Sequence, residues 1–401
     1  MFAPATTPPR LTTLIFLTGL SVLSLSMFLP SVANIAADLQ ASYVLASLSI
    51  SGYLAVTAVL QLILGPLADR YGRRPVLVIS VLLFTVASVV AAMAENIWVF
   101  LAARVVQSAI ISGAALAAAI ISDTTEKSKA AGLMGYVGMA MAVAPMVAPM
   151  LGGLLDEAFG WRSGFWLYAG FGAVLFWLVW TDLGETNPAP AETFFDQMRA
   201  YPELFRSRRF WGYSVCLAFS VGVFYLFIAS VPLVGAKVFG LSASTIGIGI
   251  GSITGGFFVG SFLSGRYSAR MGLMFMIFAG RLAAFVGIAI ALLLYLAGVT
   301  DPIIFFAGAI CGGFGNGLTV PNARAGALAI RPHLAGSASG LNGSLTVGFG
   351  AVLTIVPGLV LTETNGAWLT LLLMLLASTG ALLAAIYVWD VDRREAIAQK
   401  T

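Results

Sequence analysis

Charged residues are scarce in this sequence. Asp, Glu, Lys and Arg make up only 9% of the 401 residues, and 59% are hydrophobic. Soluble proteins carry about 25% charged residues, so this chain has too few to cover a water-exposed surface. The composition excludes a soluble globular protein and predicts an integral membrane protein that is surrounded by the lipid bilayer.

Cysteine and histidine are almost absent. The two cysteines, Cys216 and Cys311, lie inside apolar runs, and the single histidine is His333. A disulfide framework or a metal centre needs more such residues at closer spacing. No G-x-x-x-x-G-K-[ST] sequence occurs, which excludes nucleotide hydrolysis through a P-loop. No nucleophile with a base and no paired carboxylates lie at a plausible depth, so we expect no enzyme, no cofactor and no metal.

Apolar runs of about 20 residues, the length that crosses a bilayer, recur along the whole chain. Twelve such runs predict an all-α integral membrane protein with twelve transmembrane helices. The runs cover residues 11–33, 44–67, 76–94, 97–121, 131–155, 164–181, 210–234, 243–265, 273–297, 302–325, 335–361 and 367–389.

The basic residues are distributed unequally between the two sides of the membrane. With both termini in the cytoplasm, only Arg162 and Lys237 fall outside, while Arg104, Arg281 and Arg324 lie in spans and the other sixteen of the 21 fall inside. Lys and Arg stay on the cytoplasmic side of membranes, so both termini are predicted to be cytoplasmic. The basic residues form no patch for nucleic acid. Arg281 and Arg324 are expected to snorkel to the inner surface.

One long connection divides the twelve spans into six and six. It predicts three parts: an N-terminal six-helix bundle, a cytoplasmic linker and a C-terminal six-helix bundle over residues 1–181, 182–209 and 210–401. Apolar residues in the linker recur at helical spacing, which predicts a helix on the inner membrane surface that acts as a tether. These residues are Phe194, Met198, Tyr201 and Phe205.

The two halves are similar in sequence after their second spans. A shift of 200 residues superimposes Gly65, Arg70 and Gly72 on Gly265, Arg270 and Gly272. Two similar halves with a site between them are typical of secondary transporters, in which one half rocks against the other. Because the chain has no P-loop, such transport would use an ion or substrate gradient.

Residues 65–75 are predicted to form a tight cytoplasmic turn between the second and third spans. Gly65 permits a close helix approach, and Gly72 supplies a positive φ. Asp69 can accept hydrogen bonds from the next helix, and Pro75 suits that helix's first turn. The arginines, which keep the turn inside, are Arg70, Arg73 and Arg74.

Arg104 lies about seven residues inside the fourth span, where a charge is costly and needs a partner. Arginine keeps its proton, so Arg104 is expected to be a fixed positive charge that holds an anion, a carbonyl or a carboxylate. The alternative is a structural arginine bonded to helix carbonyls. Gln107 is one turn away on the same face, and we expect both side chains to face a central cavity.

The fifth span contains Pro145 and Pro149, which each interrupt the helix hydrogen-bond ladder. Gly152 and Gly153 follow one turn later and permit close contact with a neighbouring helix. The pattern predicts a kinked, tightly packed fifth helix.

Together these motifs resemble the major facilitator superfamily, and within it the drug:proton antiporters of the bicyclomycin-resistance (Bcr/CflA) type. The turn from Gly65 to Arg74 resembles the motif between helices 2 and 3, and Arg104-x-x-Gln107 resembles the helix 4 motif. Ala144-Pro145-x-x-Ala148-Pro149-x-x-Gly152-Gly153 is similar to the helix 5 motif of exporters. The residues similar to marks of the subgroup are Trp161-Arg162, Phe165-Trp166, Pro321-Asn322 and Pro332-His333-x-Ala335-Gly336.

The resemblance implies two pseudo-symmetric six-helix bundles in the bacterial inner membrane, a monomer, and rocker-switch export of small amphipathic compounds in exchange for protons, as in multidrug efflux and drug resistance. It implies a charge network of Asp69, Arg73 and Asp123 that locks the inner gate, and a gate in helix 5 that favours export. Further cavity candidates come from the helices that line the pathway in this superfamily: Ser26, Ser108, Phe224, Tyr225 and Asn316.

One position departs from the family pattern, because Ser26 stands where the drug antiporters have an aspartate. Every acidic residue is expected at a span end or in a loop, with six outside: Asp38, Glu95, Asp156, Glu157, Asp301 and Glu363. A proton carrier inside a bilayer normally needs a titratable side chain. Coupling through Asp38 or Asp123, through the substrate's own proton, or no coupling at all therefore stays open.

Without a counter-charge, Arg104 favours neutral or anionic cargo. Two alternatives to multidrug export follow from this: an exporter or facilitator dedicated to one metabolite, and a membrane sensor that does not transport.

Overall fold

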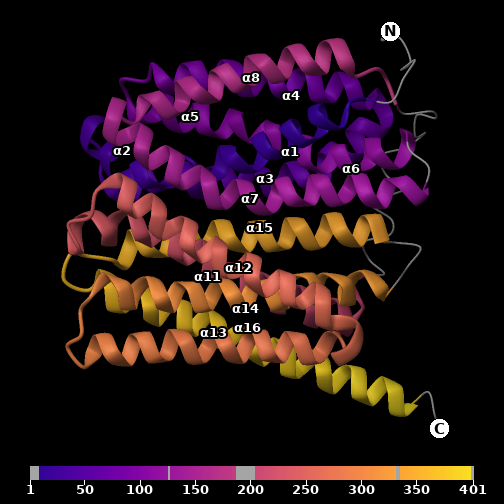
Figure 1. Ribbon diagram of the computed structural model, residues 1–401, viewed down its shortest axis with the longest axis vertical. Helices are drawn as coiled ribbons and strands as arrows, with labels where there is room; N and C mark the ends of the chain where they lie inside the picture. The colour runs from indigo at the N-terminus through magenta and orange to yellow at the C-terminus, as the bar shows by residue number, and fades with distance from the viewer. Residues whose placement is uncertain (1–8, 125–126, 187–203, 331–334, 399–401) are drawn as a thin grey trace. The chain divides into compact units, whose positions relative to one another are not determined.

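The computed structural model describes residues 9–124, 127–186, 204–330 and 335–398. Several side chains within these ranges, among them those of Asp69 and Asp123, are outside the description. The described residues form helices and no strand (Figure 1), which confirms the all-α fold class.

Eight α-helices and two 3₁₀ segments are present among the described residues of the N-terminal half, and its first and fourth spans are each interrupted by a 3₁₀ segment. The elements are α1 (Leu11–Ser26), η1 (Leu29–Ser31), α2 (Val32–Asp38), α3 (Tyr43–Tyr71), α4 (Arg73–Ala92), α5 (Ile97–Gln107), η2 (Ser108–Ile111), α6 (Ser112–Thr124), α7 (Lys127–Phe159) and α8 (Arg162–Asp182).

The part of the C-terminal half that the structure describes contains six long helices, the first of which ends in a π-helical turn, η3. The elements are α11 (Arg208–Leu233), η3 (Val234–Val238), α12 (Ala243–Met271), α13 (Leu273–Leu296), α14 (Pro302–Ala329), α15 (Ala335–Val360) and α16 (Gly366–Ala398).

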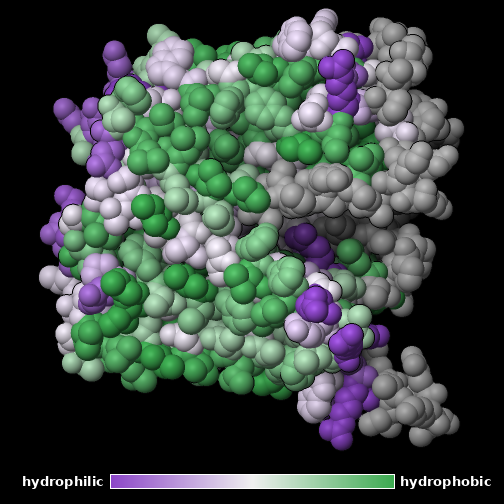
Figure 2. Space-filling view, viewed as in Figure 1, coloured by the Kyte–Doolittle hydropathy of each residue, from purple (hydrophilic) through white to green (hydrophobic). Residues whose placement is uncertain are grey.

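Ten helical segments of the described chain are long and apolar enough to cross a membrane. Their outward faces carry large apolar side chains, such as Leu293, which is 65% exposed, and Trp177, which is 63% exposed. On the face shown in Figure 2, hydrophobic residues cover the middle of the helices and hydrophilic residues gather toward helix ends. This pattern matches a surface in contact with lipid along its middle and with water at its ends.

The turn after the second span is shorter than the sequence predicts. Helix α3 continues to Tyr71 and α4 begins at Arg73, so Gly72 is the one residue between them. The expected turn over residues 65–75 is therefore wrong in extent, because polar side chains outside the hydrocarbon do not end a helix by themselves. The predicted positive φ of Gly72 is confirmed at 97°, and Gly272 repeats it at 84° between α12 and α13.

The chain divides into two compact units. The first comprises Met1–Asp196 with Ser242–Ile248, and the second comprises Gln197–Leu241 with Gly249–Thr401. Within the first unit α4 packs beside α8 and α1 beside α7, and within the second α13 packs beside α14. The predicted linker stays a prediction, because Phe194, Met198 and Tyr201 lie outside the described residues.

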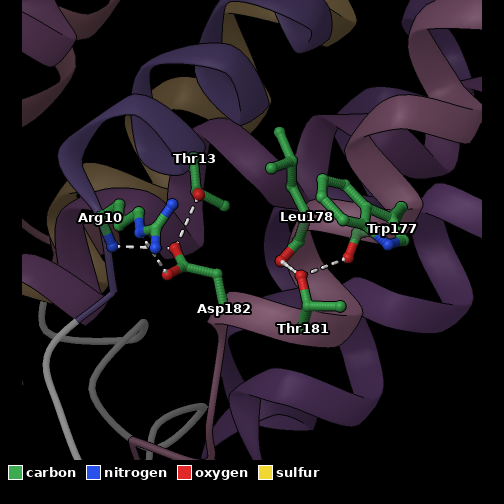
Figure 3. A network of polar contacts seen from close by, with 6 residues as sticks. All are labelled: Arg10, Thr13, Trp177, Leu178, Thr181 and Asp182. Atoms are coloured by element: carbon green, nitrogen blue, oxygen red, sulfur yellow. Dashed lines mark hydrogen bonds and ion pairs between the residues drawn. The ribbon is translucent and has the colours of Figure 1, made fainter.

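An aspartate ties the last helix of the first unit to the start of its first helix (Figure 3). The Asp182 carboxylate, at the end of α8, accepts hydrogen bonds from the Arg10 backbone N–H at 2.8 Å and from the Thr13 hydroxyl at 2.7 Å. Helix α1 has no acidic residue in its own first turn. Asp182 therefore supplies the negative charge that stabilises a helix N-terminus.

The second unit has a similar tie. Asp392 of α16 accepts hydrogen bonds from Arg209 Nε at 2.6 Å and from the Tyr213 hydroxyl at 2.8 Å. Both partners lie in the first two turns of α11. In each unit, an aspartate near the end of the last long helix therefore binds the start of the first long helix.

Removing either aspartate is expected to destabilise its unit. Asp182→Ala or Asp392→Ala should lower the free energy of unfolding by about 1 kcal/mol, the usual loss when a helix-end or charge-assisted hydrogen bond is removed. The midpoint of thermal unfolding should fall by about 2–4 °C. Thermal unfolding of the purified protein in detergent checks this. The control is Asp390→Ala, which removes an exposed i,i+4 pair with Arg394 and should change little. Equal shifts in all three variants would contradict the prediction.

Candidate functional site

The first membrane span is broken in its middle. Helix α1 ends at Ser26, and α2 begins at Val32 after a 3₁₀ segment that contains Pro30. Proline has no N–H and cannot continue the helix ladder. The last carbonyls of a helix have no partner within it, and at membrane depth unsatisfied carbonyls are costly. The break therefore needs donors from other helices.

Arg104 and Tyr168 supply these donors. Arg104 Nη1 donates to the Ser24 carbonyl at 3.2 Å, and the Tyr168 hydroxyl donates to the carbonyls of Leu23 at 3.0 Å and Ser24 at 3.3 Å. Arg104 and Tyr168 are fully buried. A positive charge at a helix C-terminus is favourable. The carbonyl partner that the sequence left open for Arg104 is thus the end of α1.

Gln107 fixes the orientation of Arg104. Its Oε1 accepts from Arg104 Nη1 at 2.7 Å, and its Nε2 donates to the Ser88 hydroxyl at 2.7 Å. The predicted side-by-side position of Arg104 and Gln107 is therefore confirmed. Both side chains are 0% exposed, so neither contacts solvent in this conformation. Their role in transport stays a prediction.

Two aromatic rings enclose the guanidinium group. Its carbon lies 4.0 Å from the Phe28 ring centroid and 4.7 Å from that of Tyr53, which is cation–π contact. The Tyr53 hydroxyl shares a 2.6 Å hydrogen bond with the Ser24 hydroxyl. Arg104 Nε and Nη2 have no hydrogen-bond partner among the described residues. The site therefore holds a desolvated positive charge whose Nε and Nη2 donors are available to a further acceptor.

The serines predicted for the cavity bond to their own helices. Ser26 and Ser108 are buried, and their hydroxyls donate to the carbonyls of Val22 at 3.3 Å and Val105 at 2.6 Å. No hydrogen bond in the described part of the chain joins either hydroxyl to Arg104. The structure thus places them near the ends of α1 and α5 without bringing their hydroxyls to the arginine.

The predicted cavity residues of the second unit lie on α11 and α14. The Phe224 and Tyr225 rings are 5.9 Å apart on α11. Tyr225 is buried against Gly350, where an added Cβ would overlap its ring. Asn316 is also buried, and its Oδ1 accepts from Arg281 Nη2 at 2.8 Å.

The expected snorkelling of Arg281 is wrong. The side chain is 0% exposed, and its Nε donates to the Thr319 hydroxyl at 2.8 Å. It turns into the bundle because α13 and α14 meet at glycines: a Cβ added to Gly280 would lie 2.5 Å from the Gly315 carbonyl oxygen. In the sequence, Arg281 and Asn316 each follow a glycine inside an apolar run, and this shared pattern was the signal that could have predicted the contact. Arg324, in contrast, is exposed.

The sequence did not indicate which carboxylate binds the start of α4 beside Gly72. Glu185, three residues after α8, accepts from the backbone N–H groups of Arg73 at 3.0 Å and Arg74 at 3.3 Å. These are the first N–H groups of α4, for which the sequence proposed Asp69. A Cβ at Gly72 would overlap the Glu185 carboxylate. A side chain at Gly72 would displace this carboxylate from the turn, and the positive φ also favours glycine there.

The remaining residues of the predicted gate are only partly described. The surroundings of Gly65 and the side chains of Asp69 and Asp123 lie outside the description, so the proposed network of Asp69, Arg73 and Asp123 stays a prediction. Arg70 is exposed and lies over the Tyr71 ring at 5.3 Å.

The exporter motif lies in one continuous helix. Pro145 and Pro149 are inside α7 and do not interrupt it. Gly152 and Gly153 are buried, and an added Cβ at Gly152 would overlap the Met27 carbonyl. The predicted tight packing is confirmed at Gly152, where α7 contacts the break of the first span.

Comparison with known proteins identifies the family. The model of the Major Facilitator Superfamily matches residues 14–355. An uncharacterized MFS-type transporter of Bacillus subtilis, YdgK, is 30% identical over 374 residues, which cover 90% of this chain and 91% of that protein. The multidrug resistance protein MdtL of Escherichia coli O45:K1 is 35% identical over 218 residues, 54% of this chain and 55% of its own length.

Solved structures share the fold. A bacterial homologue of the human lysosomal transporter Spinster, inward-facing and occupied, aligns with a TM-score of 0.73 and 18% identity over 97% of this chain and 98% of its own. The nucleoside transporter NupG (D323A mutant) aligns with a TM-score of 0.70 and 15% identity over 95% and 98%.

The chain belongs to the Major Facilitator Superfamily. It is a multi-pass membrane transporter of small-molecule substrates and not an enzyme.

Proposed function

We propose that this transporter is an exporter of small amphipathic compounds, of the Bcr/CflA drug:proton antiporter type. The two six-helix bundles, residues 1–181 and 210–401, would alternate access by a rocker-switch movement. The similarity to MdtL, a multidrug resistance protein, supports export of more than one compound.

The observation that carries this proposal is the buried Arg104 at the break of the first span. A broken helix is tolerated in a membrane where its backbone is buried in protein or lines a cavity, and such breaks form substrate sites in secondary transporters. Arg104 adds a fixed charge with two donors, Nε and Nη2, without hydrogen-bond partners among the described residues. The Phe28 and Tyr53 rings beside it are buried in this conformation, and they would offer an apolar surface to an amphipathic molecule once the break opens.

The setting of the transporter is part of the same proposal. We place it as a monomer in the bacterial inner membrane, with both termini cytoplasmic and protons as the coupling ion. The excess of Lys and Arg in the predicted cytoplasmic loops supports the orientation, and the bacterial relatives support the membrane.

A dedicated exporter or facilitator of one neutral or anionic metabolite is the second candidate. It is favoured by the absence of any carboxylate partner for Arg104 among the described side chains, because an unpaired buried cation prefers a neutral or anionic ligand. A membrane sensor without transport is the third and least favoured candidate.

The test is accumulation of cationic, neutral and anionic fluorescent compounds in a bacterium that lacks its main exporters. Expression of the chain is expected to lower the cellular content of several unrelated amphipathic compounds, and expression of an Arg104→Ala variant is not. Reduction of one anionic compound alone would support the second candidate instead. Unchanged content of every compound, with the protein present in the membrane, would reject export.

A further inference from the structure

Asp156 stands apart from the other acidic residues. Among the acidic side chains that the structure describes it is the one that is buried, with 7% of its surface exposed. As the sequence predicted, it lies at a span end, in the last turn of α7, but its side chain is turned into the protein. It lies one helical turn after Gly152 in α7, on the face that contacts the break of the first span.

The carboxylate is held by the segment that follows this break. Asn34 Nδ2 of α2 donates to Asp156 Oδ2 at 2.8 Å, and the Ser31 hydroxyl also hydrogen-bonds to the carboxylate. Ser31 is buried, whereas Asn34 is exposed. Water can therefore reach the carboxylate past one amide side chain.

The nearby charges leave Asp156 without a cation. Glu157 follows it on α7 and is exposed. From α2, Asp38 faces the same end of the unit, but it is bound by Arg162 and by Trp161 Nε1 at the start of α8. No lysine or arginine in the described ranges pairs with Asp156. A buried carboxylate with only neutral donors binds a proton far more readily than one paired with arginine.

We propose that Asp156 is the proton-binding group of the transport cycle, in place of the aspartate that is absent at Ser26. The inference rests on proton-coupled transport as proposed above. A proton from water on the outer side would bind a carboxylate oxygen and neutralise it. The hydrogen bonds from Ser31 and Asn34 would then lose their charge assistance and weaken.

This binding would act directly on the substrate site. The carboxylate holds the span after the break, at Ser31 and Asn34, while Arg104 and Tyr168 hold it before the break, at Leu23 and Ser24. Loosening one side changes how the two pieces of the span can move relative to α7. Asp156 thereby links proton binding to the helix that contacts Arg104.

The test uses the purified full chain in proteoliposomes with an imposed pH gradient. Asp156→Asn keeps the size and the hydrogen-bonding ability of the side chain but cannot exchange a proton. It is expected to lose gradient-driven uphill transport while keeping substrate exchange within about threefold of the unaltered protein. Glu157→Gln, at the exposed neighbour, is the matched control and should keep both activities. Uphill transport by Asp156→Asn, or equal loss of exchange, would overturn the proposal.

An infrared titration tests the proposal independently of any transported compound. As the pH is lowered, the unaltered protein is expected to gain a carbonyl band of a protonated carboxylic acid that Asp156→Asn lacks. If the band appears but no compound is transported, the proposed function fails while Asp156 still binds a proton. If the two proteins give the same titration, Asp156 is not the proton-binding group.

Discussion

Replacing Arg104 with alanine is expected to lower the transport rate by at least about 100-fold, which corresponds to an increase of about 2.7 kcal/mol in the activation free energy of transport. The substitution removes the fixed charge at the break of the first span, leaves Gln107 Oε1 without its donor, and leaves the Ser24 carbonyl with the Tyr168 hydroxyl alone. Uptake into proteoliposomes, normalised to the folded protein, measures the effect. Arg104→Lys keeps the charge but replaces the planar guanidinium group, which bonds to the Ser24 carbonyl and to Gln107 Oε1. Only partial activity is therefore expected from this variant.

The matched control for Arg104 is Arg281, the other fully buried arginine of the described residues. Arg281→Ala also removes hydrogen bonds, those to Asn316 and Thr319. It should lower the thermal midpoint but leave transport per folded molecule within about threefold. Equal loss of transport in both variants would mean that any buried arginine is needed for integrity, and would contradict a special role for Arg104.

Gly152→Val is expected to prevent accumulation of folded protein. The added side chain would overlap the carbonyl oxygen of Met27, a backbone atom at the break of the first span that cannot turn aside as a side chain would. Overpacking usually costs about 1–3 kcal/mol and more where the backbone must shift. The loss should appear as a missing monodisperse peak in size-exclusion chromatography of the detergent extract.

Gly170→Val is the control for this effect, because a Cβ at Gly170 has no atom within 4 Å. Its folded yield should match that of the unaltered protein. A normal yield of Gly152→Val would show that α7 can move away from the break. It would contradict the prediction that folding requires close contact between α7 and the first span at Gly152.

Local features of this protein could be predicted from its sequence. The positive φ of Gly72 follows from its place between two helices, and the contact between Arg104 and Gln107 follows from their spacing of three residues on one helix. The apolar runs predicted the helices because their length is set by the thickness of the bilayer.

The contacts across helices could not be predicted, because they join residues that are far apart in the chain. Arg104 bonds to Ser24 across 80 residues, Glu185 bonds to Arg73 across 112, and Asn34 bonds to Asp156 across 122. The sequence placed Asp156 at a span end, but only the packing of α7 on the broken span shows that it is buried. Arg281 is a similar case, since glycines on α13 and α14 decide which way its side chain turns.

The most direct test of this account is uptake of a neutral, a cationic and an anionic amphipathic compound into proteoliposomes that contain the purified protein, with and without an imposed pH gradient. We predict accumulation above the external concentration with the gradient, which a protonophore abolishes. Downhill movement that is indifferent to pH would contradict proton-coupled export.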